Sequence, residues 1–367
     1  MEKILDYLKT VSDNRKEKKV RHNIGDIIAL VFFATLAFAD EWVSIEVFGN
    51  EHEEFLRRYL ELPYGIPSHD TIQRIFAMVP PEEMQHFRAL WDEMLGSDEG
   101  DKIKKILSID GKTQRGNGNK NQKANHIVSA VDEYGFCLGE KRVNEKSNEI
   151  TAIPELLKAL NVKGHIVTID AMGTQTEIVN IIRKKRAEYV LALKGNQGTL
   201  HEDVKLYFDD AGLLSKCAYK RTAEKARGGI EVREYWQTDD IVWLSQKNSW
   251  TGLNSIAMTR NTITKDGKVT TDTRYFISSL PLDIDEIARA IRGHWMVESL
   301  HWHLDVTFRE DDNHTADKQA AFNLNIIKKL ALSVLKSYDP GKKMSLRMKR
   351  FAICTNTEKH LQRILQL

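Results

Sequence analysis

The chain has 367 residues, which is too many for one small core and predicts two or three domains. Hydrophobic residues make up 41% and charged residues 29% of it, the proportions of a folded soluble protein rather than a disordered or fibrous one. The net charge is only +2, so attraction to a polyanion would have to come from local basic runs. The three cysteines are far apart, which argues against a disulfide scaffold or a structural zinc site and fits a reducing cytosol.

Residues 1–98 are predicted to form a small helical domain. Ser68 or Asp70 can cap the helix that contains "DTIQRIFAMV", and Pro81 falls in the first turn of the following helix. The apolar segment Ile27–Ala39 follows basic residues and ends in Ala-x-Ala, as a targeting signal does. It has only 13 residues, whereas a membrane span needs about 20, and it ends too far from Met1 for a usual signal peptide. A buried core helix is therefore predicted, with no membrane partner.

Strand-like and helix-like patterns alternate over residues 104–200, which predicts the first part of a mixed α/β sheet. "ILSIDGKT" and "HIVTIDAMG" are buried-type strands, and each ends in an aspartate, Asp110 and Asp170. "HIVSAVDEYGFCLGEKRVN" is predicted to be a hairpin, and "YVLALKGNQ" a third buried-type strand. Between them, "SNEITAIPELLKAL" is predicted to be a helix with Ser147 as its cap.

The rest of the chain is predicted to consist of three segments with different secondary structure. Residues 201–282 are predicted to be mostly short strands, a β-rich insertion in which "KDGK" forms a hairpin turn. Residues 283–338 return to helices, the first of them long and starting near Asp283 or Asp285. Residues 339–367 are predicted to be a basic C-terminal tail. The predicted fold class is α/β.

The long helix carries an unusual polar stripe within "HWMVESLHWHLDVTFREDD". At 100° per residue, His294, Glu298, His301 and Asp305 fall within about 60° of one another. Carboxylates and imidazoles on an otherwise apolar helix are costly to bury unless something cationic lies opposite them.

The strand-end aspartates suggest what that cation is. Sites in α/β sheets gather where strands end, and a carboxylate at such an end needs a cation or a hydrogen-bond donor. Asp110, Asp170 and the acidic stripe therefore predict a site for Mg²⁺ or Mn²⁺. The plainer alternatives are that the aspartates are caps or turn residues, that the histidines lie in an interface, and that Trp295 and Trp302 belong to the core rather than stacking on bases.

Taken together, these segments resemble a known family. The order and spacing are those of DDE transposases of bacterial insertion sequences, in the group that includes the H-repeat-associated proteins. The resemblance covers essentially the whole chain, and its motifs are "GIPSHDTIQRIF", "SIDGKTQRG", "NEKSNEITAIPELL", "TIDAMGTQ", "YVLALKGNQ" and "RGHWMVESLHWHLDVTFREDD". It implies a ribonuclease H-like mixed sheet flanked by helices, with a helical N-terminal domain and a β-rich insertion before the helix that bears the catalytic Glu.

The resemblance also implies three catalytic, metal-binding carboxylates: Asp110, Asp170 and Glu298. Broader relatives carry the pattern Y-x2-R-x3-E-x6-K around this Glu, and here the other places hold Ile291, His294 and Asp305. No lysine-type phosphate contact is therefore assigned at position 305. Asp305, His294 and His301 are instead predicted to support the site, by orienting Glu298 or by holding a metal-bound water.

The implied activity is metal-dependent DNA transposition. Two Mg²⁺ (or Mn²⁺) ions, bridged by Asp110, would activate a water molecule to cleave the phosphodiester at a transposon end, and the freed 3′ hydroxyl would attack target DNA. The implied partner is double-stranded DNA, both the terminal inverted repeats and the target. The resemblance also implies a homodimer on DNA, because two ends have to be cut and joined. The implied location is the bacterial cytoplasm, at the nucleoid while the protein acts.

Local basic runs are predicted to bind the DNA backbone, and the plainer alternative for any single run is a solvated helix face. Lys102–Asn125 carries seven Lys or Arg against one Asp, and Lys328–Arg350 carries eight against one. Phosphate contacts of this kind weaken steeply with salt. The candidate DNA-binding residues are Lys112, Arg115, Lys194, Arg292, Lys342, Lys343 and Arg347.

Three other readings stay open at this point. A nuclease on the same core would share the carboxylates but lack strand transfer. A repurposed DNA-binding protein would have an inactive site, which fits an intact Asp–Asp–Glu set poorly. A di-iron or zinc enzyme built on Glu298-x-x-His301 would need a second Glu-x-x-His helix, and the sequence shows none.

Overall fold

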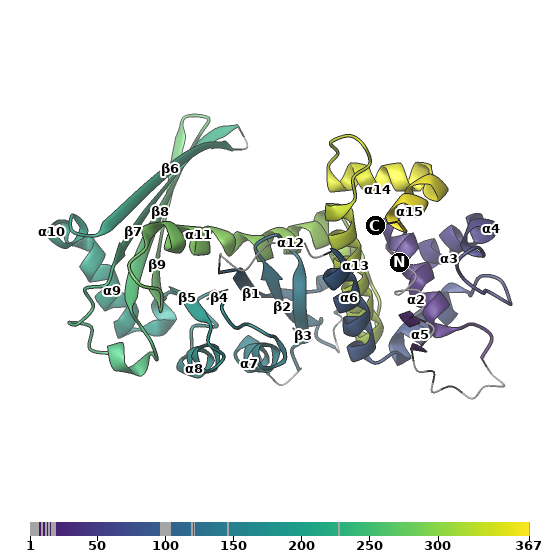
Figure 1. Ribbon diagram of the computed structural model, residues 1–367, viewed down its shortest axis with the longest axis horizontal. Helices are drawn as coiled ribbons and strands as arrows, with labels where there is room; N and C mark the ends of the chain where they lie inside the picture. The colour runs from purple at the N-terminus through teal and green to yellow at the C-terminus, as the bar shows by residue number, and fades with distance from the viewer. Residues whose placement is uncertain are drawn as a thin grey trace.

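The computed structural model describes residues 20–95, 104–118, 120, 122–144, 147–226 and 228–366, with a few positions between 7 and 15. A long sheet with helices on both faces adjoins a bundle of helices at one end (Figure 1). The strands are β1 (Ile106–Thr113), β2 (His126–Asp132), β3 (Cys137–Arg142), β4 (Ile166–Ile169), β5 (Glu188–Leu193), β6 (Ala218–Ala226), β7 (Gly229–Thr238), β8 (Ser255–Lys265) and β9 (Lys268–Ser278). The helices are α2 (Ile24–Leu36), α3 (Trp42–Glu51), α4 (Glu53–Leu56), α5 (His69–Met78), α6 (Pro81–Leu95), α7 (Glu149–Ala159), α8 (Thr176–Lys184), α9 (Thr199–Asp209), α10 (Ala211–Leu214), α11 (Ile284–Gly293), α12 (Trp295–Val306), α13 (Lys318–Ser337), α14 (Leu346–Thr355) and α15 (Thr357–Ile364).

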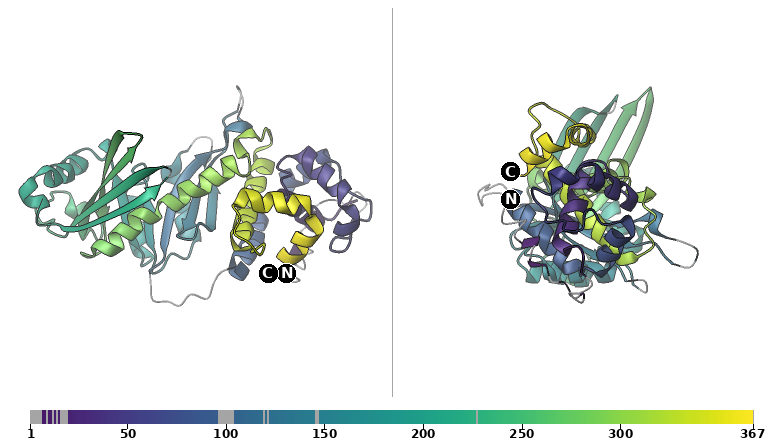
Figure 2. Two further views of the ribbon diagram at one scale, coloured as in Figure 1. Left: turned by 90° about the horizontal axis from the view of Figure 1, so that it is seen from above. Right: turned by 90° about the vertical axis from the view of Figure 1, so that its right-hand side faces the viewer.

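The sheet has nine strands in the order β3-β2-β1-β4-β5-β9-β8-β7-β6. β1 pairs with β4 and β4 with β5 in parallel, and the other neighbouring strands are antiparallel. Helices α7 and α8 cover one face, while α11 and α12 cross the other (Figures 1 and 2). β4 is buried along its whole length because both faces of the sheet are covered there. The predicted mixed sheet flanked by helices is confirmed.

The β-rich region extends this sheet instead of forming a separate one. β9 pairs with β5, so β6 to β9 continue the order of the core strands. The predicted turn between β8 and β9 is confirmed, because Asp266 and Gly267 both have positive φ, as a two-residue hairpin turn requires. The prediction of strands was wrong for α9 and α10. The buried residues of α9 follow helical spacing, which the sequence already displays at Leu200, Val204 and Phe208.

The helical part is built around α13, against which α2, α5 and α6 pack. α2 is buried on nearly every side, which confirms the predicted core helix. Among the described residues, no helix is both long and apolar enough to cross a membrane. Ser68 caps α5 and Pro81 opens α6, as predicted. α7 differs by one residue, because Asn148 and not Ser147 occupies its N-cap.

The predicted basic tail is not a tail. α14 packs on α13 and α2, and the next helix, α15, packs on α14. Ile353, Leu361 and Ile364 are fully buried, and their burial offsets the entropy cost of ordering this segment.

Three basic residues of the run Lys328–Arg350 lie in the interior. Lys328, Lys329 and Arg350 are at most 1% exposed, so these three cannot bind a polyanion. The Nζ of Lys329 lies 3.2 Å from Glu140 Oε2 on β3, and the guanidinium of Arg88 on α6 lies 3.4 Å from Glu140 Oε1. This buried network ties the helical part to the sheet.

Candidate active site

Two aspartates lie side by side at the centre of the sheet. Ile109 on β1 is in register with Ile169, the last residue of β4. The residues that follow, Asp110 on β1 and Asp170 after β4, are therefore neighbours. β4 ends there, while β1 continues along β2 alone. Backbone N–H groups of Met172 and Gly173 donate to Asp170 Oδ1, at 3.0 and 3.2 Å, and fix that carboxylate. Parallel pairing thus brings two carboxylates to one edge of the buried strands.

Glu298 reaches the same place from the helix above. The predicted long helix is divided at His294 into α11 and α12, and the junction lies over β1 and β4 (Figure 2). Ser108 Oγ donates to the carbonyl of Gly293 at 3.2 Å. Gly293 allows this close approach, because a Cβ there would lie 2.8 Å from the side chain of Ile106. Glu298 is one turn further along α12.

Asp110, Asp170 and Glu298 line one hollow of about 410 Å³. The opposite lining comes largely from β7, β8 and β9, at residues such as Tyr235 and Thr259. Four basic side chains also line it: Lys194, Arg233, Arg274 and Arg292. Arg233 is paired with Glu231 and Arg274 with Asp272, which leaves Lys194 and Arg292 as the candidates for phosphate. The hollow therefore combines carboxylates that suit a hard cation with basic groups that suit a phosphate backbone.

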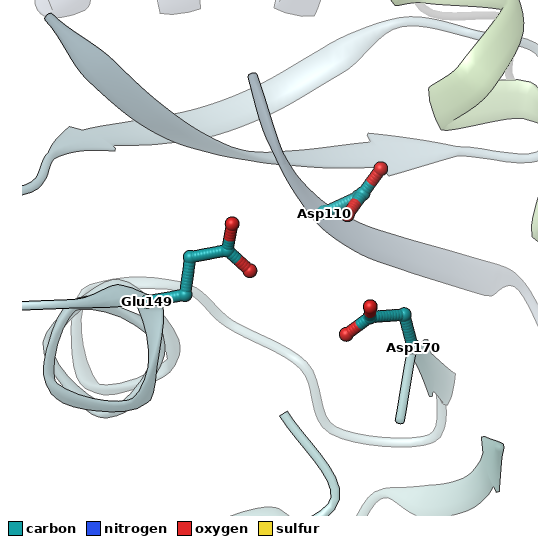
Figure 3. A group of neighbouring side chains, drawn as sticks. All are labelled: Asp110, Glu149 and Asp170. Atoms are coloured by element: carbon teal, nitrogen blue, oxygen red, sulfur yellow. The ribbon is translucent and has the colours of Figure 1, made fainter. Parts of the chain in front are cut away.

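A further carboxylate, Glu149, belongs to the same group. Carboxylate oxygens of Asp110, Glu149 and Asp170 all lie within 4.8 Å of one another (Figure 3). Glu149 is the first residue of α7, on the other side of the sheet from α12. Sequence reasoning missed it, although it stands in the motif "NEKSNEITAIPELL" that carries the family resemblance. The available signal was an acidic residue in the first turn of a helix directly before the second strand-end Asp.

The electrostatics of the group fit a divalent metal. Burial, together with the charges of Asp170, Glu149 and Glu298, raises the pKa of Asp110 to about 7. So many carboxylates in a half-buried site repel one another unless a cation lies between them. Oxygen-only donors are the set that Mg²⁺ and Mn²⁺ prefer. The residues present therefore fit the hard cation that the sequence predicted.

Burial favours the uncharged form of both histidines of the stripe. Burial lowers the pKa of His294 to about 4, and its Nδ1 lies 3.0 Å from Thr168 Oγ1 on β4. His294 therefore fixes the helix junction to the sheet. Burial and nearby cations lower the pKa of His301 to about 3. Its Nδ1 lies 3.7 Å from Asp110 Oδ2, which is too far for a hydrogen bond.

Asp305 forms an ion pair with Lys112 from the sheet. Lys112 Nζ lies 2.7 Å from Asp305, 3.1 Å from Glu310 and 3.3 Å from Asp311. Burial alone would lower the pKa of Lys112, but the carboxylates outweigh it and raise that pKa. The charge of Lys112 is thus balanced inside the protein, which argues against the predicted phosphate contact.

The other predicted DNA contacts fall in different places. Lys194 and Arg292 line the hollow, and the guanidinium of Arg292 lies 5.4 Å from the ring centroid of Trp295. Arg115 is 83% exposed near Asp311. Lys342, Lys343 and Arg347 are exposed around the start of α14, in the helical part. Trp295 and Trp302 are 37% and 54% exposed, so the core alternative was wrong for both.

The fold and the carboxylates define a class: a ribonuclease H-like α/β core with an acidic site at the ends of its central strands. Comparison with known proteins then gives the family. The model for "Transposase DDE domain" matches residues 101–334, and the model for "DDE_Tnp_1-associated" matches residues 5–91. The chain therefore belongs to the DDE transposases, in the H repeat-associated group.

Two relatives match nearly the whole chain, and a third matches a short part of it. "Putative transposase YncI" of Escherichia coli O157:H7 is 37% identical over 97% of this chain and 93% of its own length. "H repeat-associated putative transposase YhhI" of Escherichia coli K12 is 35% identical over 95% and 94%. A shorter protein of the same strain, "Inactive transposase YbfQ", is 37% identical over 20% of this chain and 89% of its own length.

Proposed function

We propose that this transposase cleaves DNA at the ends of its element and joins the freed 3′ ends to target DNA, with divalent metal held by Asp110, Asp170 and Glu298. The observation that carries the proposal is that these three carboxylates, from β1, the end of β4 and α12, line one hollow together with basic side chains. The proposed ions are Mg²⁺ or Mn²⁺, and the proposed number is two.

The residues divide the work by their positions. When bound, the metal would activate a water molecule and stabilise charge on the attacking and leaving oxygens. The charges of Asp170, Glu149 and Glu298 all act on Asp110, which is the proposed bridging ligand. Lys194 and Arg292 hold the phosphate backbone against the carboxylates, and Trp295, stacked by Arg292, offers an exposed ring to a base. His294 keeps Glu298 over the strand ends through Thr168.

The proposal includes the partners of the reaction. The DNA is double-stranded: the terminal inverted repeats of the element and the target. Two element ends have to be cut and joined together, so a homodimer on DNA in the bacterial cytoplasm, at the nucleoid, is the proposed acting form.

The test uses purified full-length protein, labelled DNA of the element ends and Mg²⁺. Nicking at the ends followed by joining to a second DNA supports transposition. Nicking without joining would overturn it in favour of a nuclease, and binding without nicking in favour of a repurposed DNA-binding protein. The matched control is Asp110→Asn, which keeps the shape of the side chain but removes its charge and is expected to bind DNA without cutting it.

Salt dependence can separate true phosphate contacts from buried or balanced charges. Lys194→Ala and Arg292→Ala are each expected to weaken DNA binding at all sequences and to reduce the slope of log affinity against log salt by about 1. Lys329→Ala serves as a contrast, because a buried lysine should change stability and leave the slope as it is. An unchanged slope in both hollow variants would contradict the proposed DNA path.

A further inference from the structure

We infer that Glu149 is a fourth metal ligand, which shares Asp110 and Asp170 with Glu298 and completes a second cation position on the α7 side of the sheet. This rests on the proposed function, since it assigns a further residue to the same metal-dependent site. The geometric basis is the group of carboxylate oxygens within 4.8 Å, which contains Glu149 and, among the described residues, not Glu298 (Figure 3).

The first step is the alternation of side chains along β1. Ser108 contacts the helix junction and Lys112 contacts α12, so Asp110 between them faces the same side as Glu298. Gly111 faces the opposite side, toward α7. The two glutamates therefore approach the strand-end aspartates from opposite faces of the sheet.

The second step is the space that Gly111 leaves. A Cβ at this position would lie 2.2 Å from Glu149 Oε1 and 2.5 Å from His126 Nε2. The carboxylate of Glu149 thus occupies the volume that any other side chain at 111 would fill. The missing side chain is what lets Glu149 reach Asp110 across the strand.

The third step is how Glu149 is held. His126 Nε2 lies 2.6 Å from Glu149 Oε1, and its Nδ1 lies 2.8 Å from Thr113 Oγ1. Thr113 and His126 are partners in the β1–β2 register, so the imidazole is fixed by the sheet itself. A carboxylate has about four acceptor positions, and one bond to His126 leaves others for a cation. Carboxylates that ligate a metal are usually themselves held by hydrogen bonds.

The fourth step concerns the two cation positions that the two glutamates would complete. Asp110 and Asp170 have the carboxylate of Glu149 within 4.8 Å on one side, and they line one hollow with Glu298 on the other. Two neighbouring cation positions that share ligands are the arrangement that two-metal phosphoryl transfer requires. With Asp110, Asp170 and Glu298 alone, one of the two positions would have fewer protein ligands.

A purely structural role for Glu149 makes a different prediction. In that case the His126–Glu149 hydrogen bond would only hold the start of α7 against β1 and β2. Glu149→Gln separates the two roles, because the amide oxygen still accepts from His126 while the charge is lost. Glu155→Gln on the same helix is the matched control, since Glu155 is exposed and pairs with Lys141 on the surface.

The experiment is a Mn²⁺ titration of the full-length protein without DNA, followed by electron paramagnetic resonance of the unbound ion. Wild type and Glu155→Gln are expected to bind two Mn²⁺ per chain. Glu149→Gln is expected to keep its melting temperature within a few degrees and to lose one site, with affinity there lower by at least about tenfold. Glu298→Gln should weaken the other site. Mn²⁺ binding by Glu149→Gln equal to wild type would overturn the inference.

A second variant tests the same point with the carboxylate still present. Gly111→Ala should displace Glu149 and His126 and reproduce the loss of the same Mn²⁺ site. Unchanged binding in this variant would also count against the inference. Because no DNA is present, the result does not depend on strand joining, so a protein that nicks without joining would refute the proposed function and leave the metal assignment standing.

Discussion

Replacing Lys112 with Met is expected to lower the rate of strand cleavage by about 100-fold while DNA affinity changes by less than about twofold. Lys112 is two residues beyond Asp110 on β1, and its partner Asp305 is two turns beyond Glu298 on α12. The ion pair therefore fixes the distance between the strand and the helix that carry the proposed ligands. A displacement of about 1 Å at a reacting centre can cost about 100-fold in rate.

The same substitution should also lower the free energy of unfolding by roughly 3–5 kcal/mol, because it leaves buried Glu310 without the cation beside it. Lys112→Arg should restore both quantities in large part. Arg115→Met is the matched control, since Arg115 is exposed next to the same Asp311. Single-turnover cleavage and DNA binding are measured separately. A loss of affinity with a shallower salt slope, and an unchanged cleavage rate, would instead support the phosphate contact predicted from the sequence.

The proximity of Asp110 and Asp170 could be predicted because it depends on local patterns. Each follows a short apolar run, and adjacent parallel strands bring such ends together. The stripe on the long helix was predictable for the same reason, since helical periodicity alone puts Glu298 and His301 on one face. What the stripe contacts was not predictable: Thr168 holds His294, and Lys112 holds Asp305.

The sequence places Glu149 in the first turn of a helix, but its closeness to Asp110 could not be predicted, because that depends on three segments at once. The start of α7 at Glu149, the missing side chain of Gly111 and the register of His126 with Thr113 together bring it to Asp110. None of these has a periodic signature in the sequence. Contacts between segments that are distant in sequence therefore determine the position of Glu149.

The prediction of DNA contacts from basic runs failed at the buried residues for a different physical reason. A lysine or arginine in an amphipathic helix reads as a solvated charge, yet Lys329 and Arg350 find carboxylates or carbonyl oxygens inside the protein. Charge counts along the chain do not show such partners, because Glu140 and Asp40 are far away in sequence. The DNA-binding surface has to be sought among basic side chains that are exposed, such as Arg292 and Arg347.

Arg350 and Arg347 make this distinction testable on a single helix. Arg350 is fully buried, donates at 2.6 Å both to Asp40 Oδ1 and to the carbonyl of Thr35, and lies between two aromatic rings, those of Phe38 and Phe308. Arg350→Met should lower the free energy of unfolding by roughly 3–5 kcal/mol, because Asp40 is left buried without its partner. Arg347→Met, one turn earlier and exposed, should change it by less than about 0.5 kcal/mol.

Urea unfolding followed by circular dichroism measures both effects. The double variant Asp40→Leu/Arg350→Met should recover much of the loss, since removing both charges avoids the unpaired carboxylate. For DNA binding the expected effects of the two variants are reversed. Arg347→Met should weaken DNA binding and reduce its salt dependence. Arg350→Met should leave DNA binding unchanged at temperatures where that variant is folded. Equal stability of the two single variants would mean that the interior pair contributes nothing and that α14 is held by its apolar contacts alone.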